Sequence, residues 1–164
     1  MGEKFNIGET GNKKYKFAEA QKGTNLFLAI YTDNEGNRSY KTISFKFVVE
    51  RLKQGLGPVP ETDTKGNKLL MYLSPNDLVY VPREDEAMSP VDKHSLDKSR
   101  IYKMVSSTGS EVYFVPCHVA SIIKDKVEFR SLNKMEKSLD GFTIKSVCWK
   151  LEVDRLGNII RVIR

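Results

Sequence analysis

"YKMVSSTGSEVYFVP", residues 102–116, is the stretch that decides the fold. Two apolar, aromatic-rich segments flank five small uncharged residues, Ser106 to Ser110. Apolar segments joined by Ser, Thr and Gly are typical of a β-hairpin, and Gly109 can adopt the positive φ that a tight turn requires. We therefore predict two strands, the second ending at Pro116, with a hydroxyl-rich tip between them.

Strand patterns also occupy much of the remaining sequence. Residues 26–31 are almost wholly apolar, "DNEGN" at 33–37 is a turn cluster, and "RSYKTI" at 38–43 returns with alternating polarity. This order predicts a second β-hairpin. Further strands are expected at 15–17, 68–73, 78–82, 142–153 and 159–164, the last two joined by the turn "DRLGN".

One helix is expected, over residues 44–54. Ser44 can accept a hydrogen bond from the first turn, and Gly55 can end the helix. Apolar residues recur at helical spacing between these two signals. The stripe expected to face the sheet is Phe45, Val48, Val49 and Leu52.

These elements define the expected fold class, which is α+β and mainly β. About eight short strands joined by tight turns predict small bent antiparallel sheets or a partly open barrel, with one clear helix. We divide the chain into an irregular lead-in (1–22), a first lobe (23–90) and a C-terminal lobe (91–164). A chain of 164 residues fits one domain or two small lobes that share a core. Trp149 is expected in that core.

The charge distribution points to a polyanionic partner. The net charge is +6 and the isoelectric point is near 9.2. Residues 91–164 carry 14 basic and 9 acidic groups, so most of the excess lies there. Basic surfaces bind phosphates with release of counterions. No apolar run suits a membrane span or a signal peptide, and two cysteines without a framework indicate free thiols in the cytoplasm.

Catalytic patterns are sparse. Cys117 and His118 are adjacent, so in a strand their side chains point to opposite faces and cannot form a dyad. The two Cys and two His residues lack the spacing of a zinc site. The acidic run at 84–86 is expected to be solvated. We therefore expect neither enzymatic activity nor a metal site in this chain.

Six segments carry a family resemblance. They are "GTNLFLAIYTDNEGNRSYKTI" (23–43), "VVERLKQG" (48–55), "KGNKLLMYLSPNDLVYVP" (65–82), "RIYKMVSSTGSEVYFVP" (100–116), "VEFRSLNKMEKSLDG" (127–141) and "VDRLGNI" (153–159). In this order they resemble the C-terminal region of type II CRISPR-associated RNA-guided DNA endonucleases, above all the compact subtype II-C effectors. The resemblance covers nearly all of the chain from about Gly23.

The resemblance implies a function in bacterial antiviral defence. In that family this region is the PAM-interacting domain, with a topoisomerase-homology lobe (here 23–90) and a C-terminal lobe, beside the wedge domain. It reads a short duplex motif next to the target, while guide RNA pairing reads the remaining sequence. The HNH and RuvC nuclease domains, with their Mg²⁺, lie elsewhere in the full-length proteins. The implied partners are target DNA, guide RNA and the remaining domains, in the cytoplasm.

The resemblance also assigns candidate contacts. The hairpin that follows the "NDLV" strand presents side chains to the PAM in the major groove, and small hydroxyls there can donate to or accept from base edges. Related proteins carry Asn or His at matching places in this loop, so the resemblance does not define the PAM sequence. The candidates for PAM reading are Ser106, Ser107, Thr108, Ser110, Asn133 and Lys145. Those for phosphate contact are Arg130, Lys134, Lys137 and Arg155, and those for RNA are Lys13, Lys14, Tyr15 and Lys16.

Two other classes of function fit the sequence without the resemblance. One is a nucleic-acid-binding β domain of another system, which would bind with steep salt dependence but without a preferred duplex motif. The other is a structural or protein-interaction domain whose basic charge is incidental.

Overall fold

The computed structural model describes residues 4–7, 18–59, 73–82, 87, 90–92, 94–124, 126–132, 137–139, 142–144, 148–153 and 159–163. For residues 18, 137–139, 142–144 and 148 it describes the backbone alone. The elements in chain order are β1 (Lys4–Ile7), β2 (Ala18–Gln21), β3 (Asn25–Thr32), β4 (Arg38–Ile43), α1 (Phe45–Lys53), η1 (Pro75–Asp77), β5 (Val79–Tyr80), β6 (Tyr102–Val105), β7 (Glu111–Ile123), β8 (Lys126–Ser131), β9 (Lys137–Leu139), β10 (Phe142–Ile144), β11 (Cys148–Val153) and β12 (Ile159–Ile163).

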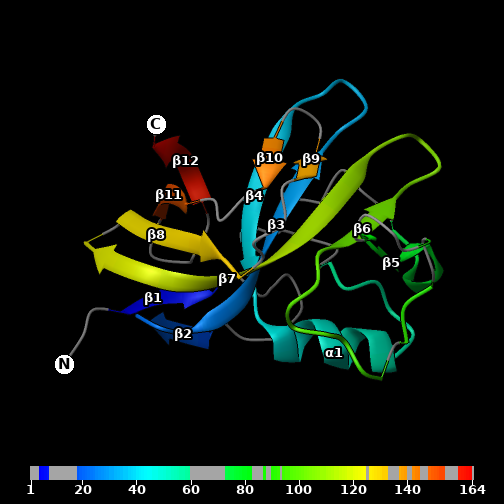
Figure 1. Ribbon diagram of the computed structural model, residues 1–164, viewed down its shortest axis with the longest axis horizontal. Coiled ribbons are helices and arrows are strands. Elements are labelled where there is room, and N and C mark those ends of the chain that lie inside the picture. Colours follow the sequence, from blue (N-terminus) through cyan, green and yellow to red (C-terminus); the bar gives the residue numbers. More distant parts are fainter. Residues whose placement is uncertain are drawn as a thin grey trace.

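Six antiparallel strands form a nearly closed barrel, in the order β12-β11-β8-β7-β3-β4 (Figure 1). β12 comes close to β4, so the two ends of the sheet almost meet. β5 and β6 extend the sheet beside one half of β7. The expectation of a mainly β fold with a partly open barrel and one helix is confirmed. Strands from both expected lobes pair in one sheet, so the lobes share a core.

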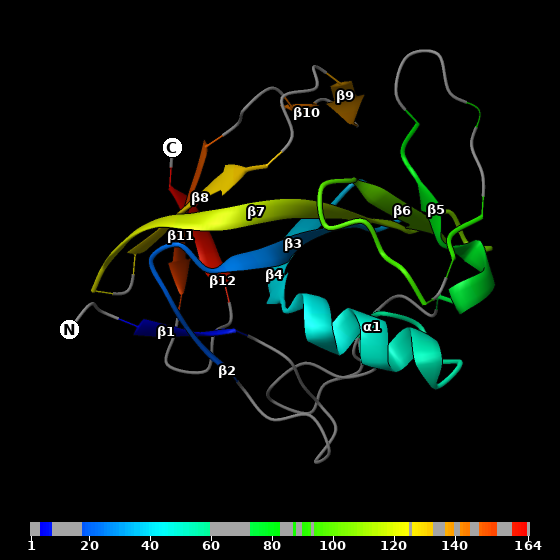
Figure 2. The same cartoon turned by 60° about the horizontal axis from the view of Figure 1, so that its bottom comes forward.

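The long strand β7 joins the two parts of this sheet (Figure 2). Along one edge it pairs with β3. Along the other edge it pairs first with β6, up to Phe114, and then with β8, from Cys117. The expectation that the strand ends at Pro116 is wrong, because β7 continues to Ile123. Pro116 lies where the partner changes, and its carbonyl oxygen accepts a hydrogen bond from the N–H of Leu132 at 2.8 Å.

Strand β3 is apolar throughout because both of its faces are covered. Leu26, Leu28 and Ile30 point into the barrel, whereas Phe27 and Ala29 pack on the opposite face. Strands that are buried on both faces read as continuous apolar runs rather than alternating ones. The sheet therefore separates two cores, one inside the barrel and one beneath α1.

The paired strands β1 and β2 pack against the core inside the barrel. Phe5 of β1 contacts Phe129 of β8 edge to face, with 5.7 Å between ring centroids, a favourable aromatic geometry. Trp149 of β11 belongs to the same cluster and is 5% exposed. Its expected place in the core is confirmed.

Helix α1 covers the second core (Figure 2). The Ser44 hydroxyl accepts a hydrogen bond from the N–H of Phe47 at 3.1 Å, and Gly55 has a φ of +75°, as the capping signals predict. The expected apolar stripe is partly wrong. Val49 is only half-buried, whereas Phe47 and Arg51 are buried beside the other stripe residues.

The β3–β4 hairpin is confirmed, with its turn built around Asp33. The Asp33 carboxylate accepts hydrogen bonds from the N–H groups of Glu35 and Asn37, at 2.9 and 2.8 Å, and from the Asn37 amide at 3.0 Å. Gly36 supplies the positive φ, +87°. These hydrogen bonds hold the Asp33 pKa below its usual value, chiefly through Asn37.

The other expected strands have mixed outcomes. The one at 78–82 is only two residues long, as β5. The long strand at 142–153 is observed as β10 and β11, with 145–147 outside the described residues. The strands at 15–17 and, except for Leu73, 68–73 lie outside them as well, as does the turn at 154–158. In the described part of the chain, no helix is both long and apolar enough to cross a membrane.

Candidate nucleic-acid interface

The tip of the β6–β7 hairpin is a closed five-residue loop. The N–H of Ser106 donates to the carbonyl oxygen of Ser110 at 2.7 Å, and the N–H of Gly109 donates to that of Ser106 at 3.1 Å. The Ser106 hydroxyl accepts from the N–H of Ser110 at 3.1 Å and lies 2.8 Å from the Thr108 hydroxyl oxygen. With Gly109 at a φ of +89°, the loop is held by its own backbone and hydroxyl groups.

Exposure divides the four candidate hydroxyl residues of this tip. Ser107 and Thr108 are exposed, and Ser106 is half-buried. Ser110 is 4% exposed, so its side chain has little access to a partner outside the protein. Of the four PAM-reading candidates in the tip, Ser107 and Thr108 are therefore the two with exposed side chains.

Charges of both signs surround the base of the tip. Lys103 of β6 pairs with Glu111 at 3.3 Å and lies over the ring of Tyr113, 5.3 Å from its centroid. The β3–β4 turn projects on the same side, because Thr32 lies opposite Glu111 in the sheet (Figure 1, upper right). That turn contributes Asp33 and Glu35. Arg38, at the start of β4, lies opposite Thr32. The described residues around the tip therefore include basic and acidic side chains in similar numbers, without a marked excess of positive charge.

Arg130, the phosphate candidate on β8, lies on the outer face of the barrel. Its side chain is 59% exposed and pairs with Glu128 at 3.3 Å. His118 of β7 and Cys148 of β11 occupy the positions beside it in the sheet. Cys117, the residue before His118 in β7, is buried, whereas His118 is half-exposed. The side chains of Cys117 and His118 therefore point to opposite faces of the sheet, as expected.

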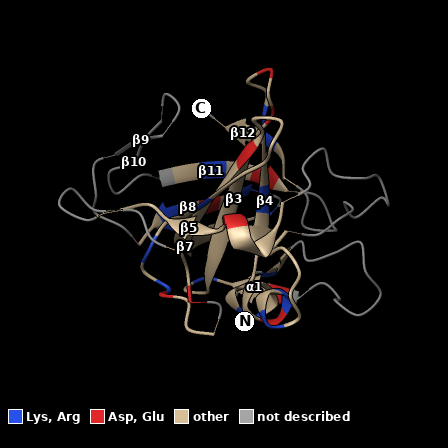
Figure 3. Ribbon diagram, turned by 90° about the vertical axis from the view of Figure 1, so that its right-hand side faces the viewer, with Lys and Arg blue, Asp and Glu red and all other residues tan. Residues whose placement is uncertain are grey.

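The outer face around Arg130 alternates in charge. On β8, β11 and β12, basic residues interleave with two glutamates, and both colours are visible on the barrel strands in Figure 3. Arg161 of β12 pairs with Glu152 of β11 across the strands at 2.8 Å, whereas Arg130 and Glu128 pair within β8. The members of this charged face are Lys126, Glu128, Arg130, Lys150, Glu152 and Arg161. Basic residues exceed acidic ones on it, which favours phosphate contact.

The hairpin tip and Arg130 are well separated. Glu111, next to the tip, and His118, opposite Arg130, are seven positions apart on β7. At about 3.3 Å per residue this corresponds to roughly 23 Å along the strand. One base pair cannot touch both places, so they can serve only as two contacts on an extended partner.

The remaining candidates are only partly described. Lys137 begins β9, which pairs with β10, but its side chain is not described. The other candidates lie outside the described residues: Lys13, Lys14, Tyr15, Lys16, Asn133, Lys134, Lys145 and Arg155. Their assignments stay predictions.

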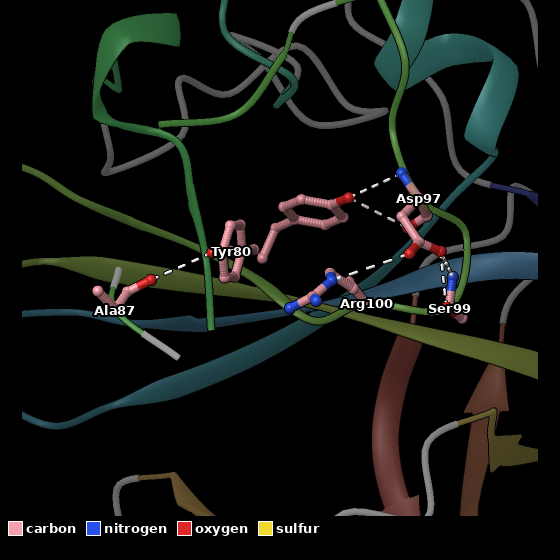
Figure 4. A network of polar contacts seen from close by, with 6 residues as sticks. Tyr80, Ala87, Asp97, Ser99 and Arg100 are labelled. Carbon is pink, nitrogen blue, oxygen red and sulfur yellow. Dashed lines mark hydrogen bonds and ion pairs between the residues drawn. The ribbon is translucent and has the colours of Figure 1, made fainter. Parts of the chain in front are cut away.

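A network of hydrogen bonds and an ion pair holds residues 97–100, the segment before β6 (Figure 4). This network was not predicted from the sequence. The Tyr102 hydroxyl accepts from the N–H of Asp97 at 2.8 Å and donates to its carbonyl oxygen at 3.2 Å. The Asp97 carboxylate accepts from the Ser99 N–H at 2.8 Å and approaches Arg100 at 3.8 Å. Arg100 stacks on Tyr80 of β5, 4.4 Å from the ring centroid. The spacing Asp-x-Ser, typical of a turn held by aspartate, was the available signal.

The buried side chains of Cys117 and Tyr31 carry titratable groups. Burial raises the pKa of the Cys117 thiol and that of the Tyr31 phenol. Cys117 is a free thiol, and a buried thiol with a raised pKa is a poor nucleophile. Within the described residues, no group of three or more His, Cys, Asp or Glu side chains could hold a metal ion.

Comparisons with known proteins add no family assignment. No protein-family model matches the chain, and no curated protein matches its sequence.

Proposed function

We propose that this chain is the PAM-recognition module of a bacterial RNA-guided DNA endonuclease. The observation that carries the proposal is the exposure of Ser107 and Thr108 at the end of the β6–β7 hairpin. The major groove of B-DNA admits a two-stranded β-ribbon, and hydroxyls can donate to or accept from base edges there. The six segments that resemble the type II effectors include this hairpin and support the same function.

The strand and the hydrogen bonds that hold the tip are suited to the recognition of bases. β7 runs from the tip into the barrel and pairs with β3, β6 and β8 on the way. The tip is closed by its own hydrogen bonds. Contacts built on rigid elements hold their geometry better than those on loose loops. A base edge that meets Ser107 therefore meets a residue whose backbone is held in place by the loop.

We assign phosphate contact to the charged outer face, at Arg130. Phosphate contacts position a protein on a duplex, and base contacts specify the sequence. The distance of roughly 23 Å along β7 separates these two tasks. In this proposal the charged face holds the nucleic-acid backbone while the tip, in its nearly neutral setting, approaches bases.

The chain is proposed to bind and not to cleave. Cleavage, and the Mg²⁺ that supports it, belongs to nuclease domains of a longer protein. Guide RNA is the second proposed partner, through the basic and aromatic residues at 13–16. The proposed setting is the bacterial cytoplasm, in defence against foreign DNA.

Binding by the chain itself tests the nucleic-acid part of this proposal. We expect the affinity for duplex DNA to fall as salt rises, because counterions are released on binding. If the chain bound neither DNA nor RNA at low salt, this result would favour a structural or interaction domain. Cleavage by the chain supplied with Mg²⁺ would contradict a binding module.

A depletion assay on a randomised flanking sequence tests the recognition part. The full-length effector that contains this chain is compared with Ser107→Ala, Thr108→Ala and Lys145→Ala. We expect a short motif to be depleted from the library by the unmodified protein, and a different motif to be depleted by at least one of the two tip variants. Binding without any motif would instead favour a nucleic-acid-binding β domain of another system.

A further inference from the structure

The hydrogen bonds within the tip distinguish Ser107 from the other tip hydroxyls. Ser106 and Thr108 are bonded to each other, at 2.8 Å between their hydroxyl oxygens, and Ser106 also accepts from the N–H of Ser110. Ser110 is buried. Ser107 is exposed, and within the described part of the chain its hydroxyl has no hydrogen-bond partner. Its donor and its acceptor sites are therefore both available to a ligand.

We infer that Ser107 is the base-contacting residue of this loop and that Ser106 is its positioning residue, an inference that rests on the proposed function. The Ser106 hydroxyl connects the beginning of the loop to its end. It contacts the hydroxyl of Thr108 and accepts a hydrogen bond from the N–H of Ser110. It closes the tip and leaves the Ser107 side chain exposed. Ser106 acts on the partner only through this geometry.

The chemistry of one hydroxyl sets the kind of specificity. A hydroxyl can donate to N7 of either purine or to O4 of thymine, and it can accept from the amino group of cytosine or adenine. It makes one hydrogen bond at a time to a given edge, whereas Arg or Asn can make two. The base pair at Ser107 is therefore read loosely, with a preference below about tenfold.

The inference predicts that specificity can be gained at this position. An arginine at 107 can bond O6 and N7 of guanine, and an asparagine can bond N6 and N7 of adenine. We expect Ser107→Arg to prefer guanine, and Ser107→Asn to prefer adenine, by about tenfold or more at one position of the motif. A gain of this kind cannot arise from a loss of folding.

Ser106 supplies the matched comparison. Ser106→Ala removes the hydroxyl that closes the loop, so we expect weaker motif selection at every position and no new base preference. Ser106→Thr keeps the hydroxyl oxygen and should restore the original motif. A side chain that merely stabilised the fold would change thermal stability and leave the relative preferences among bases unaltered.

The experiment is depletion of a randomised flanking duplex by the guide-loaded full-length protein, with melting temperatures measured for each variant. New guanine and adenine preferences at one shared position for Ser107→Arg and Ser107→Asn would support the inference. If the unmodified protein selects a motif, but Ser107→Ala, Ser107→Arg and Ser107→Asn all select the same one, Ser107 does not contact a base. If the unmodified protein selects no motif, the proposed function itself fails.

Discussion

The N–H of Leu132 donates to the carbonyl oxygen of Pro116 at 2.8 Å, just beyond the last residue of β8. In an antiparallel ladder the N–H and the C=O of one residue point to the same side. The nitrogen of Pro116 therefore faces the same edge of β7, where it can donate nothing. At this residue that edge passes from β6 to β8. Because Pro116 lies where the neighbouring strand changes from β6 to β8, its missing N–H removes only one hydrogen bond between strands. Strand β7 therefore stays continuous from the tip to the barrel.

Two buried tyrosines should respond in opposite directions to loss of the hydroxyl. The buried Tyr31 hydroxyl has no hydrogen-bond partner among the residues that the structure describes, whereas that of Tyr102 makes two hydrogen bonds to the backbone of Asp97. We expect Tyr31→Phe to stabilise the protein by about 1 kcal/mol and Tyr102→Phe to destabilise it by about as much. Urea unfolding of both variants measures this. Destabilisation by Tyr31→Phe would show that the phenol has a partner in solution.

Acid should weaken the β3–β4 turn through Asp33. Hydrogen bonds, chiefly from Asn37, lower its pKa from the ordinary value of 3.8. A carboxylate with a lowered pKa contributes stability above pH 3.8, and this contribution is lost as the pH falls through the folded-state value. The difference in melting temperature between the unmodified protein and Asp33→Asn should therefore be present at neutral pH and shrink in acid. A difference that does not vary with pH would contradict a role for the charge.

Arg130 should contribute to the salt dependence of DNA binding. If it contacts one phosphate, Arg130→Gln should lower the slope of log affinity against log salt by about 0.9, equally for all sequences. Glu128→Gln should raise the affinity, because it removes the carboxylate 3.3 Å from Arg130. The matched control is Lys4→Gln, which breaks an exposed pair with Glu19 outside the charged face and should leave the slope unchanged. Equal slopes for Arg130→Gln and the unmodified protein would exclude the contact.

Gly57 should not tolerate a side chain. A Cβ at this position would lie 2.6 Å from the backbone carbonyl oxygen of Leu73, and the Gly57 carbonyl oxygen accepts a hydrogen bond from Arg51. The backbone is therefore held on both sides. We expect Gly57→Ala to lower the free energy of unfolding by about 1–3 kcal/mol. Ser39→Ala, at an exposed site on β4, is the control and should change it by less than about 0.5 kcal/mol.

The sequence predicted correctly those features that depend on residues close to one another in the chain. The turn at 33–37 and the limits of α1 depend on side chains within a few residues of each other, such as Ser44 and Phe47. The continuation of β7 past Pro116 depends on which strands lie beside it, and this is not encoded nearby. The buried position of Arg51 was missed for a similar reason. Its guanidinium stacks on Phe47 and bonds Gly57, although the residue type suggests exposure.

In the candidate site, too, the features set by nearby residues could be predicted, and those set by tertiary contacts could not. Ser, Thr and Gly predict an exposed turn at 106–110, and the exposure of Ser107 and Thr108 agrees with this. The orientation of each hydroxyl depends on three-dimensional contacts, so the inward bonds of Ser106 and the burial of Ser110 could not be read from the sequence. The distance between the tip and Arg130 depends on the pairing of β7 with β8.

The most direct measurement is a structure of the full-length protein with guide RNA and a target duplex that carries its flanking motif. We expect the hydroxyl oxygen of Ser107 to lie within about 3.2 Å of a donor or acceptor on a base edge in the major groove. A tip that faces solvent, or that packs against another domain away from the duplex, would contradict the account.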